Sequence, residues 1–234
     1  MAENKEDMAR LLYLAVLLLA PAFGWPQTNN ATDLILYWTF DDIKSNVVMD
    51  VSGHGHHGMV KGKIQEVEGV KGKAIRFSGA DGDCFGTVYC ADTPALNPPQ
   101  ITITFWLKPV RWCGKGNPVI NKGWDMGWGI DPHYWRTTIL FCANIGKGRT
   151  DTAGDIDLPL NQWRYNAVTF DGKTVVIYAD KTTTIRNDVP GILNSLHEIL
   201  RVGGASPAVA CIDELKIYRR ALNPAEIMAD QILP

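Results

Sequence analysis

The stretch VTFDGKTVVIY, residues 168–178, shows most directly how this chain folds. Two runs with the period-two alternation of β-strands flank Asp171 and Gly172. An Asp-Gly pair in this position favours the tight turn of a β-hairpin, because glycine accepts the positive φ that such turns need. We therefore expect two neighbouring antiparallel strands whose register is fixed by this turn.

Similar strand-like runs continue in both directions along the chain. From residue 34 onward, short segments rich in β-branched and aromatic residues alternate with clusters of Gly, Asn, Asp and Pro, a pattern typical of antiparallel sandwiches. The best candidates are residues 34–40, 74–79, 101–109, 118–123, 137–145, 164–170, 174–180 and 211–218. A short helix is expected at residues 221–231, where Asn223 can cap, Pro224 fits the first turn and Glu226 completes a capping box.

Length and composition limit the classes of protein that fit. The chain has 234 residues, a formal charge of -2 and 46% hydrophobic residues, so it can bury a sizeable core. This charge balance argues against a nucleic-acid partner. Residues 34–234 contain no stretch with the composition of a linker, and we expect them to form one domain.

The first residues differ in character from the rest. Residues 11–23 form an apolar run that is short for a membrane span and is followed by small residues. We interpret residues 1–24 as a secretory signal peptide, cleaved before Trp25, with a retained membrane anchor as the alternative. Residues 25–33 form a polar segment before the domain. This organisation predicts a secreted or cell-surface protein.

The segment DVSGHGHHG, residues 50–58, raises the question of a metal site. Transition metals favour imidazole ligands, and His54, His56 and His57 are close together. Alternatively, the glycines set the backbone angles of a turn and the histidines fill exposed positions between them. The residues alone leave both interpretations open.

The order of several segments resembles a known family. ILYWTFDD (35–42), DVSGHGHHG (50–58), ITITFWLKP (101–109) and CIDELKIYRRALNPAEI (211–227) resemble, in this order, the laminin G-like members of the concanavalin A-like lectin/glucanase jelly rolls. The resemblance implies an all-β fold, a two-sheet antiparallel jelly-roll sandwich with a short C-terminal helix, usually exported and used in recognition or adhesion. It also matches the glycines of residues 50–58 to a family turn, which favours the turn over the histidine site and makes the histidines dispensable.

The resemblance further implies a structural calcium ion bound by oxygen ligands. The carboxylates that family-like geometry would bring together are Asp41, Asp42, Asp50 and Asp213. Strand alternation places Asp213 on the same face as Leu215 and Ile217, so its carboxylate is expected to point inward and to need a partner. The alternative is a hydrogen-bonded aspartate without an ion.

The five cysteines permit two disulfides and one free thiol in an exported chain. The pairs that we favour are Cys84 with Cys90 and Cys113 with Cys142. Cys211 lies in an expected central strand, where a buried free thiol is ordinary.

Binding is better supported than catalysis. The aromatic residues Trp112, Trp124, Tyr134 and Trp135 lie in or beside glycine-rich loops, where they can stack on sugars or anchor a protein ligand. The alternative is that the aromatic residues of this region form a second small core, and we expect Trp128 to be a core residue. Asp155 and Asp157 suggest a glycosidase, but Pro159 stands where a third carboxylate is needed.

We therefore expect a non-catalytic domain that binds a glycan or an extracellular protein. The alternative is a subunit of an extracellular assembly, a homo-oligomer or filament, in which residues 25–33 add a strand to a neighbour. A glycoside hydrolase is the least favoured function.

Overall fold

The computed structural model describes residues 33–77, 86–111, 118–123, 126–133, 138–155, 157–180, 182–194, 196–204 and 209–232. These residues belong to one compact unit, Ala31–Pro234. The predicted signal peptide and most of the polar segment after it lie outside the described residues. No helix among the described residues has the length and apolar character needed to cross a membrane.

The described chain is built mainly of antiparallel strands, with a 3-10 helix η1 (Pro94–Leu96) and the α-helix α3 (Pro224–Gln231). The strands are β1 (Leu34–Lys44), β2 (Val47–Asp50), β3 (Gly58–Gly62), β4 (Gln65–Glu68), β5 (Lys73–Phe77), β6 (Gly86–Cys90), β7 (Ile101–Arg111), β8 (Ile120–Lys122), β9 (Trp128–His133), β10 (Thr138–Ile145), β11 (Gly148–Ala153), β12 (Arg164–Phe170), β13 (Thr174–Ala179), β14 (Thr182–Asp188), β15 (Leu200–Gly203) and β16 (Val209–Tyr218).

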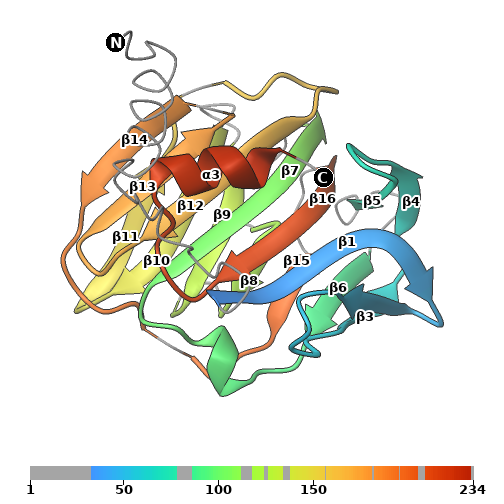
Figure 1. The fold of residues 1–234 in the computed structure, drawn as a ribbon, viewed down its shortest axis with the longest axis horizontal. Coiled ribbons are helices and arrows are strands. Elements are labelled where there is room, and N and C mark those ends of the chain that lie inside the picture. The colour runs from blue at the N-terminus through green and yellow to red at the C-terminus, as the bar shows by residue number, and fades with distance from the viewer. Residues whose placement is uncertain are drawn as a thin grey trace, which may run out of the picture. The chain divides into compact units, whose positions relative to one another are not determined.

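Hydrogen bonds connect the strands in the order β11-β10-β9-β8-β15-β6-β3-β2-β1-β16-β7-β12-β13-β14, with β5 also paired to β16 and β4 to β5. This path folds over into two facing layers, with β1, β16, β7, β12 and β13 in one and β8, β9 and β10 in the other (Figure 1). The main hydrophobic core contains Trp38 and Phe105 from the first layer and Trp128 and Phe141 from the second. The all-β sandwich that the sequence predicts is therefore confirmed.

The predicted hairpin forms between β12 and β13. Val168 pairs with Ile177, and Thr169 pairs with Val176. Gly172 adopts a φ of 93°, and the Asp171 carboxylate accepts hydrogen bonds from the backbone N–H groups of the two residues after this glycine. The turn chemistry read from the sequence thus sets the register of these strands.

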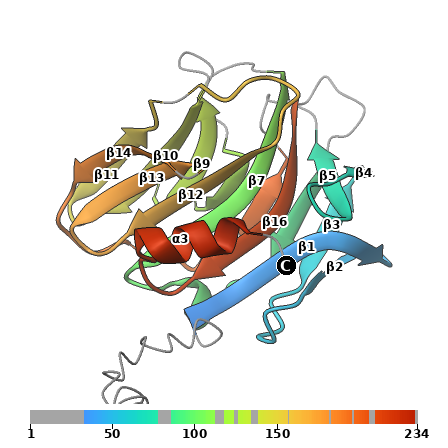
Figure 2. The same cartoon turned by 45° about the horizontal axis from the view of Figure 1, so that its top comes forward.

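Helix α3 packs on the outer face of the first layer, across β12, β7 and β16 (Figure 2). The predicted capping box is present, since Asn223 and Glu226 each accept from the other's backbone N–H. Beneath the helix, the Asp230 carboxylate accepts from the Tyr165 hydroxyl at 2.8 Å and from Lys216 Nζ at 2.9 Å. These contacts fasten the helix to the sheet.

The first and last strands, β1 and β16, are neighbours. In β16 the register shifts between Asp213 and Lys216, and Glu214 has a φ of 51°. This bulge inserts a residue, so Ile212 and Leu215 both face the main core. The expectation that Asp213 shares a face with Leu215 and Ile217 is therefore wrong, because the period-two argument does not hold across a bulge.

Candidate functional site

The turn between β2 and β3 has the shape that its glycines predict. Gly53 and Gly55 adopt φ values of 89° and 76°, which favour glycine over other residues. Gly58 is needed for close packing instead, because a Cβ added there would lie 2.5 Å from Val88 Cγ1 and 3.0 Å from a ring carbon of Trp38. The interpretation of residues 50–58 as a glycine-shaped turn is confirmed.

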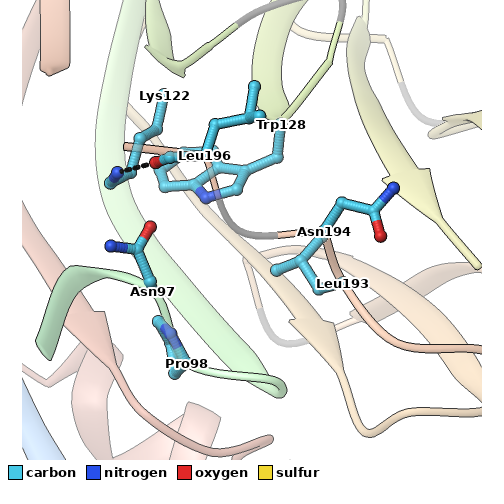
Figure 3. A pocket seen from close by; sticks show the side chains of 7 residues that line it. All are labelled: Asn97, Pro98, Lys122, Trp128, Leu193, Asn194 and Leu196. Atoms are coloured by element: carbon cyan, nitrogen blue, oxygen red, sulfur yellow. Dashed lines mark hydrogen bonds between the residues drawn. The ribbon is translucent and has the colours of Figure 1, made fainter. Parts of the chain in front are cut away.

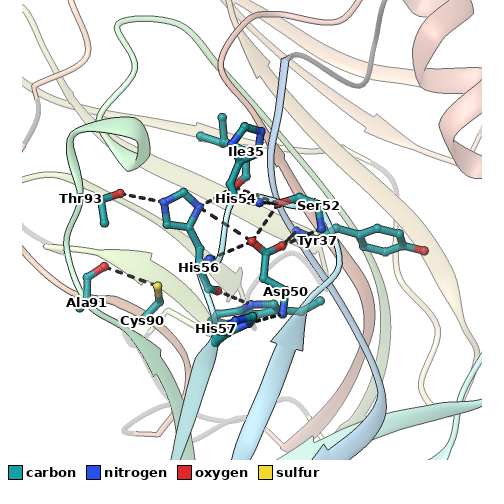
Figure 4. Close-up of polar contacts among 11 residues, drawn as sticks. Ile35, Tyr37, Asp50, Ser52, His54, His56, His57, Cys90, Ala91 and Thr93 are labelled. Carbon is teal, nitrogen blue, oxygen red and sulfur yellow. Dashed lines mark hydrogen bonds and ion pairs between the residues drawn. The ribbon is translucent and has the colours of Figure 1, made fainter.

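Asp50 forms the centre of this turn (Figure 4). Its carboxylate accepts from the backbone N–H of Tyr37, Ser52 and His56, each at 2.9 Å, and from the Ser52 hydroxyl at 2.8 Å. Burial acts to raise the pKa of Asp50, but these hydrogen bonds outweigh it and hold the pKa below its usual value. Asp50 therefore serves the turn itself, and its acceptor capacity is already used.

His56 is buried, with 6% of its surface exposed. Its Nδ1 lies 2.6 Å from the Ile35 carbonyl, which can only accept, so Nδ1 carries the proton. Its Nε2 lies 2.9 Å from the Thr93 hydroxyl, and its own carbonyl accepts from the Trp38 indole at 2.9 Å. His56 thus joins β1, the turn and the segment before η1 (Figure 4).

The expectation that all three histidines fill exposed positions is wrong, because His56 is buried. His54 and His57 are exposed, but the His57 Nδ1 accepts from the Asp50 backbone N–H at 3.0 Å, and His56 is buried. Among the described residues, no group of three or more His, Cys, Asp or Glu side chains is placed to hold a metal ion. His56 is buried although the next residue, His57, is exposed, and this change between neighbours was not expected from the sequence.

The four carboxylates expected at a calcium site divide among three places. Asp50 lies in the glycine turn, and the exposed Asp42 pairs with Lys44 at 2.6 Å. Asp41 and Asp213 approach a common turn, residues 69–73, from β1 and β16. Asp41 Oδ1 accepts from the backbone N–H of Lys73 at 2.8 Å, and Asp213 Oδ2 accepts from that of Val70 at 2.7 Å. Two of the four residues therefore contact the same turn.

The surroundings of Asp213 are rich in carboxylate oxygen. Burial raises the pKa of Asp213 to about 7, against the opposing effect of backbone N–H donors from residues 70 and 71. Glu214 is also buried; one of its oxygens accepts from the Tyr37 hydroxyl, and the other, Oε1, has no hydrogen-bond partner among the described residues. Oxygen donors of this kind fit a hard cation such as calcium better than a transition metal.

The aromatic residues expected to contact a ligand, Trp112, Trp124, Tyr134 and Trp135, lie outside the described residues. The strand ends that flank them are described. Strands β8 and β9 are antiparallel, so the start of β8 and the end of β9 lie at the same end of the pair. In the sequence, residues 112–117 precede the start of β8 and residues 134–137 follow the end of β9, whereas residues 124–125 come between the end of β8 and the start of β9. The strand ends next to Trp124 are therefore not at the same end of β8 and β9 as those next to the other three. Trp128 is a core residue, as expected.

The cysteine predictions are tested only in part. Cys90, Cys142 and Cys211 are buried, and none of them forms a disulfide with another described residue. The burial expected of Cys211 is confirmed, and its reduced state stays a prediction. Cys84 and Cys113, the partners proposed for the other two, lie outside the described residues, so both pairings remain predictions.

A pocket at one end of the sandwich contains a buried lysine that the sequence reading missed. It is lined by Asn97, Pro98, Lys122, Trp128, Leu193, Asn194 and Leu196 (Figure 3). Lys122 Nζ donates to Asp92 Oδ1 and the Leu196 carbonyl, both at 2.6 Å, and to the Glu198 carbonyl at 2.7 Å. Its three protons are thus used within the protein. Lys122 lies two residues after the core residue Ile120, so strand alternation could have predicted that its side chain faces inward.

Asp155 and Asp157 do not lie on a strand. Strand β11 ends at Ala153, and both carboxylates are exposed in the segment that follows it. Paired catalytic carboxylates of glycosidases need a fixed separation across a sugar bond. Asp155 and Asp157 therefore lack a strand that would fix the separation of their carboxylates.

Comparison with solved structures gives several matches to the fold. Domain 4 of an extracellular arabinanase from Geobacillus stearothermophilus, in complex with arabinotriose, matches with a TM-score of 0.69 and 20% identity, over 86% of this chain and 98% of that one. The binding domain of Paraclostridial Mosquitocidal Protein 1 matches with a TM-score of 0.69 and 18% identity, and this chain covers 52% of it. The binding domain of botulinum neurotoxin DC, in complex with rat synaptotagmin II, matches with a TM-score of 0.68 and 18% identity, again over 52% of that chain.

The chain thus spans about half the length of the two toxin domains and nearly all of the arabinanase domain. A search of curated protein sequences finds no match. A family model described as the concanavalin A-like lectin/glucanase superfamily, of laminin G type, matches residues 82–228, more than half of the chain. The fold, the strand order and this match together show that the chain belongs to the laminin G-type family of the concanavalin A-like lectin/glucanase superfamily.

Proposed function

We propose that this chain is a non-catalytic binding domain that recognises carbohydrate or a cell-surface ligand. The observation that carries the proposal is the match along nearly the whole of an arabinanase domain whose structure contains arabinotriose. The exposed, strand-free position of Asp155 and Asp157 supports binding rather than hydrolysis. The toxin domains, one of them bound to synaptotagmin II, leave a protein ligand as part of the same proposal.

The apolar run at residues 11–23 supports export of the protein, with its ligand outside the cell. For the calcium ion, the residues that would contribute ligands are Asp41 and Asp213, whose carboxylates both contact the turn of residues 69–73. Bound there, calcium would neutralise buried carboxylates and tie β1, β16 and this turn together.

The function is tested with the purified protein on an array of neutral and acidic oligosaccharides that includes arabino-oligosaccharides. We expect saturable binding to a defined glycan class and no release of new reducing ends from the bound glycans. Hydrolysis of a bound glycan would contradict the non-catalytic assignment. Failure to bind any glycan, together with elution as a large homo-oligomer, would favour the assembly subunit instead.

A further inference from the structure

The sheet that β8 forms with β15 and β6 carries, on its outer face, a row of side chains that the sequence did not predict. Tyr89 on β6, Arg201 on β15 and Asn121 on β8 are direct cross-strand partners. Their sequence neighbours Val88, Val202 and Ile120 belong to the main core, so these three side chains project from the opposite face. An aromatic ring, a guanidinium and an amide therefore stand side by side.

The hydrogen-bonding groups of this row have no partners within the described part of the protein. Arg201 and Tyr89 are half-buried and make no hydrogen bond or ion pair there. Asn121 is 8% exposed, and its amide likewise has no hydrogen bond to a described residue. The Asn121 amide is nevertheless not among the fully buried side-chain atoms that lack a partner, so its nitrogen and oxygen still reach solvent.

The next residue in the row is Gly129 on β9, which pairs with Asn121 and adds no side chain to the face. Direct cross-strand partners have Cβ atoms about 5 Å apart, so the row extends roughly 10 Å over three strands. This length is comparable to that of a disaccharide. On the other side, Tyr89 pairs with the exposed Met59 of β3, which lengthens the apolar part of the surface.

We propose that Tyr89, Arg201 and Asn121 form a binding site for a carboxylate-bearing glycan. The guanidinium presents a planar fork that matches a carboxylate in a bidentate pair. The amide of Asn121 donates to and accepts from sugar hydroxyls, and the ring of Tyr89 offers a face on which a sugar ring stacks. Lys61, two residues after Met59 on the same face of β3, adds positive charge.

This inference rests on the proposed function and specifies its site and ligand class. It places the site on strands, whereas the sequence reading placed the ligand in the tryptophan-containing loops. Strand residues are held by the sheet hydrogen bonds, so the three groups are arranged before a ligand arrives, which lowers the entropic cost of binding.

The test compares the wild-type chain with Arg201→Ala, Arg201→Lys and Asn121→Ala on an array of sialylated, uronic-acid-containing and neutral oligosaccharides. The control is Arg186→Ala, which removes an exposed arginine from β14. We expect the wild type and the control to bind acidic glycans equally. Each row variant should lose at least tenfold in affinity with an unchanged melting temperature, and the lysine variant should fail to restore full binding.

If Arg201→Ala and Asn121→Ala bind acidic glycans as tightly as the wild type does, this site is wrong but the proposed function is unaffected. Binding confined to neutral glycans would overturn the ligand class. Absence of any glycan binding by the wild type would overturn this site and leave a protein ligand as the remaining form of the proposed function. Recognition of a protein alone, unaffected by enzymatic removal of its glycans, would overturn this site while keeping the proposed function.

Discussion

Replacing His56 by alanine tests whether the glycine turn depends on this imidazole. The change removes the contacts of Nδ1 with the Ile35 carbonyl and of Nε2 with the Thr93 hydroxyl, but keeps the backbone bonds to Asp50 and from Trp38. Leaving a buried hydrogen-bonding group unpaired costs about 1–3 kcal/mol. Because the Ile35 carbonyl is buried and the half-buried Thr93 can reach water, we expect a loss of about 2–4 kcal/mol in the free energy of unfolding.

The measurement is urea unfolding followed by tryptophan fluorescence, at a pH where imidazole is neutral. His54→Ala is the matched control, because His54 lies in the same turn but is exposed, and its free energy of unfolding should change by no more than about 0.5 kcal/mol. Thr93→Val should fall between the two. If His56→Ala and His54→Ala unfold at the same urea concentration, the imidazole has no structural role and the reasoning is refuted.

Three further predictions follow from the turns and carboxylates. Removal of calcium by EDTA should lower the melting temperature of the wild type but not of Asp213→Ala; identical melting curves for the wild type with and without EDTA would exclude a structural calcium ion. In calcium-free buffer, the raised pKa of Asp213, about 7, means that the folded state binds a proton more tightly than the unfolded state, so this contribution to stability is complete below about pH 4 and is lost as pH rises toward 7. Urea unfolding at pH 5 and pH 8 should show a smaller decrease for Asp213→Asn than for the wild type, and equal decreases would contradict the assignment. Gly58→Ala should cost about 1–3 kcal/mol, because its Cβ would meet Val88 and Trp38, and an unchanged urea midpoint would mean that this packing relaxes freely.

The features that follow local rules could be predicted from the sequence. The hairpin at Asp171 and Gly172 and the capping box of α3 depend on residues close together in the chain. Period-two alternation and turn chemistry are sufficient for such features because no distant partner changes them.

The errors and omissions come from long-range geometry. The bulge at Glu214 places Asp213 and Leu215 on opposite faces of β16, and no residue type in this strand indicates a bulge. The burial of His56 depends on Thr93, which lies 37 positions away. The row on β6, β15 and β8 joins residues that are neighbours only after the sheet has formed, so alternation shows that each faces outward but not that they meet.

The position of β16 has a consequence for how the chain folds. This strand pairs with β1, β5 and β7, yet it ends at Tyr218, long after β1 begins at Leu34. During synthesis, β1 and β7 therefore each keep an unpaired edge until β16 has left the ribosome. Contacts of such long sequence separation slow folding, because loop closure precedes their stabilising effect. Exposed strand edges also invite pairing with other chains. A truncation before residue 209 should consequently yield an aggregating chain rather than a smaller folded domain.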